Sequence, residues 1–135
     1  MNGPEAFYDT NVVLYLLSPD PAKADRAEAL LAGGGRISVQ VLNEFVAVAA
    51  RKLSMSWAEI HETLSIVRSV CLVEPLTVET HDRARLIAER YGFHFYDALI
   101  VATALLSGCA VLYSEDLQSG QSIDARLTVV NPFHP

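Results

Sequence analysis

The sequence predicts an α/β fold in which a parallel sheet is flanked by helices. Short apolar runs that suit buried strands alternate with longer segments of helical periodicity, and this alternation favours parallel strands joined by helical crossovers. The chain has 135 residues, a usual size for one domain. It contains no internal repeat and no second domain boundary, so we assign residues 1–135 to a single domain.

The first half of the chain contains two predicted strands and three predicted helices. A polar turn at residues 9–11 separates the first strand from the first helix, and the glycines at residues 33–35 end the second helix. Apolar residues at spacings of three and four mark the longer helices. In chain order we expect a strand at Ala6–Tyr8, a short helix at Val12–Leu17, a helix at Ala22–Ala32, a brief strand at Arg36–Ser38 and a helix at Val39–Leu53.

The second half repeats this alternation, with clearer helix ends. Ser56 and Glu59 form a capping-box pattern that opens one helix, and Thr77 and Gly92 stand at the two ends of another. The segments that follow from apolar runs and breakers are strands at Cys71–Val73, Ala110–Tyr113 and Leu127–Val130, a helix from Tyr96 or Asp97 to Gly108, and a flexible loop through Ser119–Ser122.

Composition excludes several classes of protein. Apolar residues make up 51% of the chain and charged residues 19%, which excludes a disordered acidic tail. Cys71 and Cys109 lie in apolar runs and are predicted to be reduced core thiols. No signal peptide or membrane-length apolar segment is present, so we expect a cytoplasmic protein with no membrane contact. The net charge of −6 argues against tight binding of RNA through electrostatics alone.

Four acidic residues stand where a ligand site is expected. Asp9 follows the first strand and Asp116 follows the strand that ends at Tyr113, so parallel strands would bring both to one edge of the sheet. Asp97 begins a helix that is apolar nearly all round, although it also fits an N-cap. Glu44 lies on a largely apolar helix without a partner three or four residues away, so it either faces solvent or is compensated from outside its helix.

A divalent cation would relieve the repulsion among these carboxylates. Mg²⁺ prefers carboxylate oxygens and water, and Mn²⁺ accepts the same ligands. Zinc is disfavoured, because the four histidines do not pair with cysteines at zinc-site spacing: His61, His81, His94 and His134. Of these, only His94 is retained as a neighbour of the site, because it lies three residues before Asp97.

Two phosphoryl-transfer classes with a similar strand-end aspartate are disfavoured. A haloacid-dehalogenase-like phosphatase requires a second aspartate two residues after the first, and here that position is Asn11. A response-regulator receiver requires a lysine after a late strand, and the segment Tyr113–Asp116 contains none.

The residues around the four acids resemble the PIN-domain nucleases and, among them, the VapC-type ribonuclease toxins of toxin–antitoxin pairs. The resemblance covers nearly the whole chain as a single PIN domain. It rests on four fragments in the same order: Asp9-Thr10-Asn11-Val12, Asn43-Glu44-Phe45, Tyr96-Asp97-Ala98-Leu99-Ile100-Val101-Ala102 and Ser114-Glu115-Asp116-Leu117-Gln118.

The resemblance implies a PIN-like (Rossmann-like) sheet of about five parallel strands in the order 3-2-1-4-5. It implies that Asp9, Glu44, Asp97 and Asp116 are the catalytic and metal-binding acids, with Glu115 as a substitute for the more variable Asp116. Four polar residues would support them: Thr10, Asn11, Asn43 and Ser114. The implied activity is that of a hydrolase, in which one or two Mg²⁺ or Mn²⁺ ions activate a water for endoribonuclease cleavage of RNA.

The resemblance also implies partners. These are an RNA substrate such as tRNA or rRNA, a cognate antitoxin protein, and a second copy of the chain in a homodimer. Apolar residues predicted to receive an antitoxin segment are Leu53, Met55 and Trp57 between two helices, and Leu14 and Leu17 on the first helix. The alternative is a catalytically degenerate PIN-like domain that only binds RNA or protein.

Overall fold

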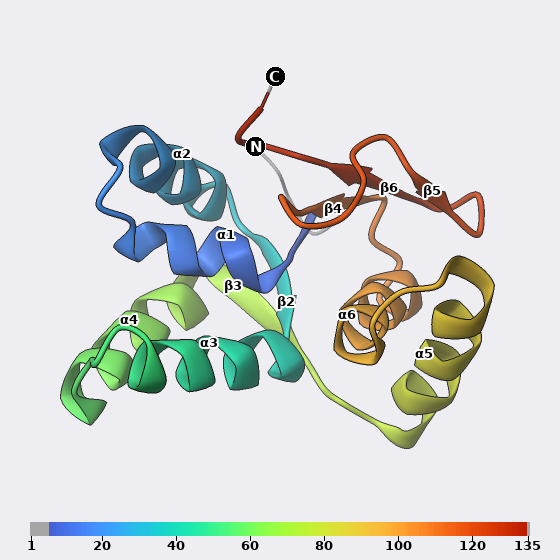
Figure 1. Ribbon diagram of the computed structural model, residues 1–135, viewed down its shortest axis with the longest axis horizontal. Helices are drawn as coiled ribbons and strands as arrows, with labels where there is room; N and C mark the ends of the chain where they lie inside the picture. The colour runs from blue at the N-terminus through green and yellow to red at the C-terminus, as the bar shows by residue number, and fades with distance from the viewer. Residues whose placement is uncertain (1–5, 135) are drawn as a thin grey trace.

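The computed structural model describes residues 6–134, which form a six-stranded sheet in the order β3-β2-β1-β4-β6-β5 (Figure 1). All neighbouring strands are parallel except β5 and β6, which are antiparallel. The strands are β1 (Ala6–Tyr8), β2 (Gly35–Ser38), β3 (Cys71–Glu74), β4 (Val111–Tyr113), β5 (Ser122–Ile123) and β6 (Leu127–Val130). The α/β class and the implied order of the five parallel strands are therefore confirmed.

The sixth strand corrects the prediction of a flexible loop through Ser119–Ser122. Ser122 lies opposite Thr128, so the end of that segment pairs with β6. The turn between β5 and β6 contains Asp124 and Ala125, both with positive φ, at 52° and 57°. Three residues, 124–126, connect the strands, and two successive residues with positive φ suit a tight hairpin turn. Alanine rarely takes positive φ, and the usual glycine-containing turn signal is missing from the sequence.

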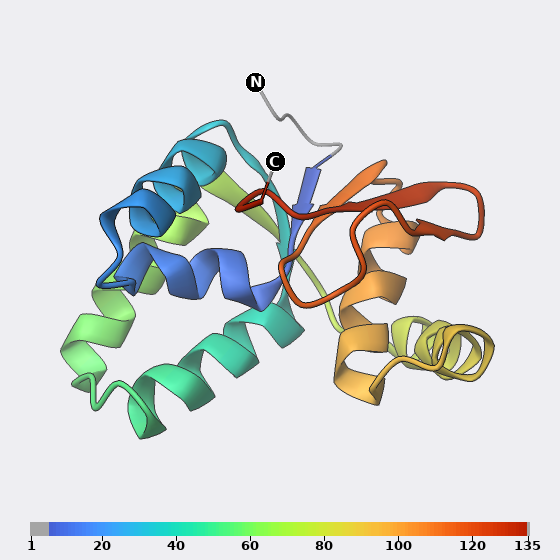
Figure 2. The same ribbon diagram turned by 45° about the horizontal axis from the view of Figure 1, so that its top comes forward.

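Helices cover both faces of the sheet. Helices α1 to α4 lie on one face, and α5 and α6 lie on the other (Figure 2). The helices are α1 (Thr10–Leu14), the 3₁₀ turn η2 (Tyr15–Leu17), α2 (Pro21–Ala32), α3 (Val39–Arg51), α4 (Trp57–Val70), α5 (Val78–Tyr91) and α6 (Phe95–Leu106). Among the described residues, no helix is long and apolar enough to cross a membrane.

Side-chain caps set the helix ends that matter for the acids. The Asp9 carboxylate accepts a hydrogen bond from the backbone of Thr10, so α1 begins at Thr10 rather than at Val12. His94, not Asp97, caps α6, because its Nδ1 accepts from the backbone of Tyr96. The N-cap interpretation of Asp97 is therefore wrong, and Asp97 lies inside the first turn of the helix.

Three of the predicted helix ends are confirmed. Ser56 and Glu59 make both hydrogen bonds of the capping box at the start of α4. Thr77 caps α5, and Gly92 ends it in the left-handed conformation, with φ of 74°. These caps fix the ends of the two helices that precede β3 and α6.

The core lies around the central strand β1. Phe7 and Tyr8 are fully buried, and eight consecutive residues of α6, from 98 to 105, are buried against the sheet. Gly35 is required beside Tyr8, because its φ is +142° and an added Cβ would lie 2.6 Å from the Tyr8 ring. Both cysteines are buried, as predicted, and burial raises the pKa of the Cys71 thiol to about 11.

Candidate active site at the edge of the sheet

The register of the central strands brings distant polar residues to one edge. Tyr8 at the end of β1 lies opposite Tyr113 at the end of β4, so Asp9 and Ser114 follow neighbouring strands at the same level. The backbone N–H of Asp9 donates to the Tyr113 carbonyl over 3.0 Å. The Ser114 hydroxyl then donates to Asp9 Oδ2 over 2.7 Å. This is the arrangement expected at the carboxyl ends of parallel strands.

Asp9 is the most buried of the acids, with 3% of its surface exposed. Its Oδ1 accepts from the backbone N–H of Thr10 over 2.7 Å, and its Oδ2 accepts from Ser114 and from Asn11 Nδ2. Burial raises the pKa of Asp9 to about 7, and the nearby charges of Asp97 and Asp116 add to the rise. The negative charge of this residue is therefore costly in the protein alone.

Asn11 connects the acids of β1 and β4. Its Nδ2 lies 3.3 Å from Asp9 Oδ2 and 3.2 Å from Asp116 Oδ2, so one amide donates to two carboxylates. Its Oδ1 accepts from the backbone N–H of Glu115 over 3.2 Å. Asn11 is itself buried, and it bridges residues that are more than 100 positions apart in the chain.

Glu44 is held by side chains on two helices. Thr10 Oγ1 donates to Glu44 Oε1 over 2.8 Å, and Gln40 Nε2 donates to Glu44 Oε2 over 3.0 Å. The expectation that Glu44 has no partner four residues away is therefore wrong. Gln40 lies one turn earlier on α3 and is 8% exposed. A buried glutamine four residues before a glutamate is the signal that sequence reasoning missed.

Asp97 lies on α6, on the face of the sheet opposite to the α3 helix that carries Glu44 (Figure 2). It is half-buried in the first turn of α6. Burial raises its pKa, the charges of Glu44 and Asp116 raise it further, and the neighbouring His94 lowers it. Since the charge of Asp97 also acts on Asp9, Asp97 lies within electrostatic reach of each of the other three acids.

Asp116 is the exposed member of the four. Its side chain accepts from Asn11, and its backbone N–H donates to Ser114 Oγ over 3.2 Å. The neighbouring Glu115 does not take its place, because the Glu115 carboxylate accepts from Tyr15 and pairs with Lys23. The hydrogen bond from Tyr15 lowers the pKa of Glu115.

Asn43 is the one predicted supporting residue that the structure does not bring to the acids. It lies on the exposed side of α3, and no hydrogen bond joins it to them within residues 6–134. The adjacent Glu44 faces the site, and a helix turns by about 100° per residue. Gln40, one turn away, supports Glu44 instead.

The cluster is rich in oxygen donors and poor in positive charge. No salt bridge among residues 6–134 involves Asp9, Glu44, Asp97 or Asp116. In that part of the chain, no three His, Cys, Asp or Glu side chains already stand in an arrangement that could hold a metal ion. Asp9, Glu44 and Asp116 instead accept from hydroxyl, amide or backbone donors, whereas the half-buried Asp97 carboxylate accepts no hydrogen bond within the described residues. Carboxylate oxygens are hard donors, of the kind that Mg²⁺ and Mn²⁺ accept as ligands.

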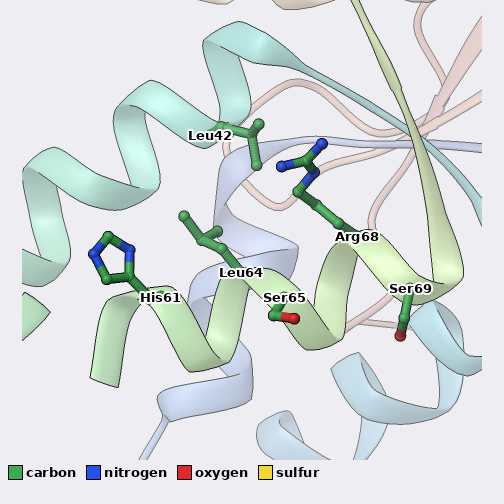
Figure 3. A pocket seen from close by; sticks show the side chains of 6 residues that line it. All are labelled: Leu42, His61, Leu64, Ser65, Arg68 and Ser69. Atoms are coloured by element: carbon green, nitrogen blue, oxygen red, sulfur yellow. The ribbon is translucent and has the colours of Figure 1, made fainter. Parts of the chain in front are cut away.

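A separate cavity of about 480 Å³ lies between α3 and α4 (Figure 3). It is lined by Leu42, His61, Leu64, Ser65, Arg68 and Ser69. None of the four acids and none of their hydrogen-bond partners lines it. This cavity is therefore distinct from the acidic cluster.

Comparison with known proteins identifies the fold. The family model described as PIN domain matches residues 6–119. A toxin–antitoxin complex from Klebsiella pneumoniae contains a similar chain, with a TM-score of 0.71, 22% identity, and coverage of 94% of this chain and 97% of that one. VapC20 from Mycobacterium tuberculosis, described as a sarcin-ricin loop cleaving toxin, is similar with a TM-score of 0.67 and 22% identity. That match covers 82% of this chain and 89% of VapC20.

A third similar structure is that of FitAcB from Neisseria gonorrhoeae. Its TM-score is 0.67 at 20% identity, and the match covers 96% of this chain and 99% of that one. No protein of curated function matches the sequence. At these identities the structural likeness establishes a common fold.

Proposed function

The chain belongs to the PIN domain family, and from that premise we propose that it is a metal-dependent endoribonuclease. The observation that carries this proposal is the burial of Asp9 among three further acids with no cationic side chain paired to any of them in residues 6–134. A buried carboxylate is normally paired or bound to a metal. A divalent cation would supply the missing positive charge.

Asp9, Glu44, Asp97 and Asp116 would hold Mg²⁺, with Mn²⁺ as an alternative ion. Bound there, the ion would lower the pKa of a water and neutralise negative charge on a phosphodiester. The chain's own residues orient the acids: Thr10 and Gln40 direct Glu44, while Ser114 and Asn11 direct Asp9. Binding would exchange some of these hydrogen bonds for contacts to the ion.

RNA is the proposed substrate class. The M. tuberculosis structure is described as a toxin that cleaves the sarcin-ricin loop, which supports RNA for a chain of this fold. Single-stranded or looped regions of tRNA or rRNA suit such a site, because an A-form duplex hides its base edges. Because the chain carries a net charge of −6, we expect its affinity for RNA to depend on the bound divalent ion.

A digest of RNA tests this function. We expect purified wild-type protein to cleave RNA in millimolar Mg²⁺. Cleavage should stop when EDTA is added, because the acids alone cannot activate water or neutralise phosphate charge. Asp97→Asn should lower the cleavage rate by at least about a hundredfold, because loss of a residue that only supports a metal ligand already costs about 10–100-fold and Asp97 is proposed to hold the ion itself. The rates are measured by gel electrophoresis of a labelled tRNA and a labelled rRNA fragment.

The control is a protein prepared identically with Glu74→Gln, which alters a carboxylate in an ion pair with Arg36 outside the cluster. Equal cleavage by wild type and Asp97→Asn would reveal a contaminating ribonuclease and reject the assignment. A wild-type protein whose melting temperature does not respond to Mg²⁺ or Mn²⁺ would favour the alternative, a PIN domain that binds RNA or protein without catalysis.

We further propose that the protein acts in the cytoplasm as the toxin of a toxin–antitoxin pair and that it forms a homodimer. The K. pneumoniae structure is described as a toxin–antitoxin complex, which supports an antitoxin partner for this fold. Leu53 and Trp57, which are 45% and 61% exposed, offer it apolar surface between α3 and α4. Leu14 and Leu17 are partly buried against the core and therefore offer an antitoxin less apolar surface.

Expression in bacteria tests the toxin role. Wild-type protein should arrest growth because it depletes functional RNA, whereas Asp97→Asn produced at the same level should not. Growth is followed by culture density, and protein levels are followed by immunoblot. Normal growth with active wild-type enzyme would reject the toxin role and leave the nuclease proposal standing.

A further inference from the structure

A second polar network lies next to the acidic cluster, and we call its three residues, Tyr15, Lys23 and Glu115, the Glu115 anchor. The Tyr15 hydroxyl donates to Glu115 Oε1. Lys23 Nζ lies 3.3 Å from Glu115 Oε2 and 3.3 Å from the Tyr15 hydroxyl oxygen. The same ammonium group lies 4.5 Å from the centre of the Tyr15 ring, within range of a cation–π contact.

The anchor joins three separate segments of the chain and is partly shielded from water. Tyr15 comes from η2, Lys23 from α2, and Glu115 from the loop after β4. The Phe133 ring packs edge-on against Tyr15 with the ring centres 4.7 Å apart. The Glu115 side chain is only 19% exposed, so its ion pair is less screened than a fully exposed one.

Glu115 is fixed at two points. Its side chain is held by the anchor, and its backbone N–H donates to Asn11 Oδ1 over 3.2 Å. It stands between Ser114, which is buried against Asp9, and Asp116, which is exposed. Among the described residues, Asn11 is the only side chain that donates to the Asp116 carboxylate. Asn11 therefore contacts both the backbone of Glu115 and the side chain of Asp116.

We propose that Glu115 is a positioning residue that acts through Asp116: the contacts of Glu115 with Tyr15 and Lys23 hold the loop so that Asp116 faces Asp9 and can share a divalent cation with it. The inference rests on the proposed function, since it concerns the metal of that site. Lys23 neutralises the charge of Glu115. The anchor thus fixes the loop without adding net negative charge to the acids.

Metal titrations of anchor variants test the proposal. Glu115→Ala should raise the Mn²⁺ dissociation constant, measured by calorimetry, and the Mg²⁺ concentration for half-maximal cleavage, each by about tenfold. Glu115→Gln, which retains a hydrogen-bond acceptor for Tyr15, should show a smaller change. Lys23→Met removes the charge and keeps the apolar stem, and it should fall between them. The KM for RNA should remain within about twofold of wild type, since the anchor does not contact RNA.

Glu74→Ala is the matched control, because Glu74 is also in an ion pair and its side chain is 23% exposed. It should lower the melting temperature as much as Glu115→Ala without changing the metal requirement. Unchanged metal affinity in Glu115→Ala and Lys23→Met would overturn the proposal, as would an equal loss of affinity in Glu74→Ala. Wild-type protein that binds Mn²⁺ but leaves RNA intact would reject the nuclease function, while calorimetry would still decide the role of the anchor.

Discussion

Replacing Asp9 by asparagine is expected to abolish the proposed cleavage of RNA and to stabilise the metal-free fold. Cleavage should fall by about 10²–10³-fold, the scale on which a preorganised electrostatic group acts in catalysis. Stability should rise because the buried carboxylate, with a pKa raised to about 7, is costly to ionise. The substitution also places an amide N–H₂ against Asn11 Nδ2, which offsets part of the gain.

The raised pKa of Asp9 also determines how the stability of the metal-free protein changes with pH. The pKa of Asp9 is about 7 in the folded chain and 3.8 in the unfolded chain. Between these values the folded state holds a proton that the unfolded state has released. The contribution of Asp9 to the stability of the metal-free wild type should therefore fall as pH rises from about 4 to 7, by about 4 kcal/mol. Asp9→Asn should lack this contribution and show only the smaller fall that the raised pKa of Asp97 causes.

Thermal unfolding in EDTA measures the effect. Above neutral pH, a net gain of about 2 kcal/mol would raise the Tm of Asp9→Asn by about 5–10 °C over wild type. Millimolar Mg²⁺ should raise the Tm of wild type and not that of the variant. A variant less stable than wild type at every pH would mean that the Asp9 carboxylate stabilises the fold without metal, contrary to its burial.

The second large effect is expected at Asn11. Asn11→Asp would replace the amide that donates to Asp9 and Asp116 with a carboxylate of the same shape, which adds a third negative charge. Near pH 8 in EDTA the free energy of unfolding should fall by about 3–5 kcal/mol, the cost of an unpaired buried charge. The loss should shrink near pH 5, where raised pKa values let the clustered carboxylates protonate. Chemical denaturation at both pH values gives the measurement.

Asn11→Ala separates charge from lost hydrogen bonds. It should destabilise by a smaller amount, about 1–3 kcal/mol, that varies less with pH than the loss in Asn11→Asp. Millimolar Mg²⁺ should restore more stability to Asn11→Asp than to Asn11→Ala, because a cation compensates charge. If the two variants unfold alike at both pH values, the amide of Asn11 does not separate the carboxylates as described.

The positions of three of the four acids could be predicted from the sequence because each follows a simple rule. Asp9 and Asp116 come after buried strands that parallel pairing sets side by side, and Asp97 lies in the first turn of the most apolar helix. The strand order came from the family resemblance, because apolar periodicity identifies strands without saying which strands are neighbours. The structure then confirmed that order.

The contacts between the acids could not be predicted in this way. Nothing in the sequence shows that one amide of Asn11 reaches both Asp9 and Asp116, because the contact depends on how α1 is set against the loop after β4. Glu115 and Asp116 are adjacent and chemically alike, yet Tyr15 and Lys23 engage only Glu115. Tertiary packing determines which of the two carboxylates is engaged, and the local residue types and spacing do not show how the segments pack.

The central position of β1 also bears on the order of events during synthesis. Asp9 is made near the start of the chain, but the hydroxyl that orients it belongs to Ser114, 105 residues later. The strand that carries Ser114 to this edge, β4, pairs directly with β1. Because a chain emerges from the ribosome N-terminus first, the four acids cannot assemble until most of it has been translated. Under the proposed function, a growing chain would therefore be unable to cleave the RNA of the ribosome that is making it.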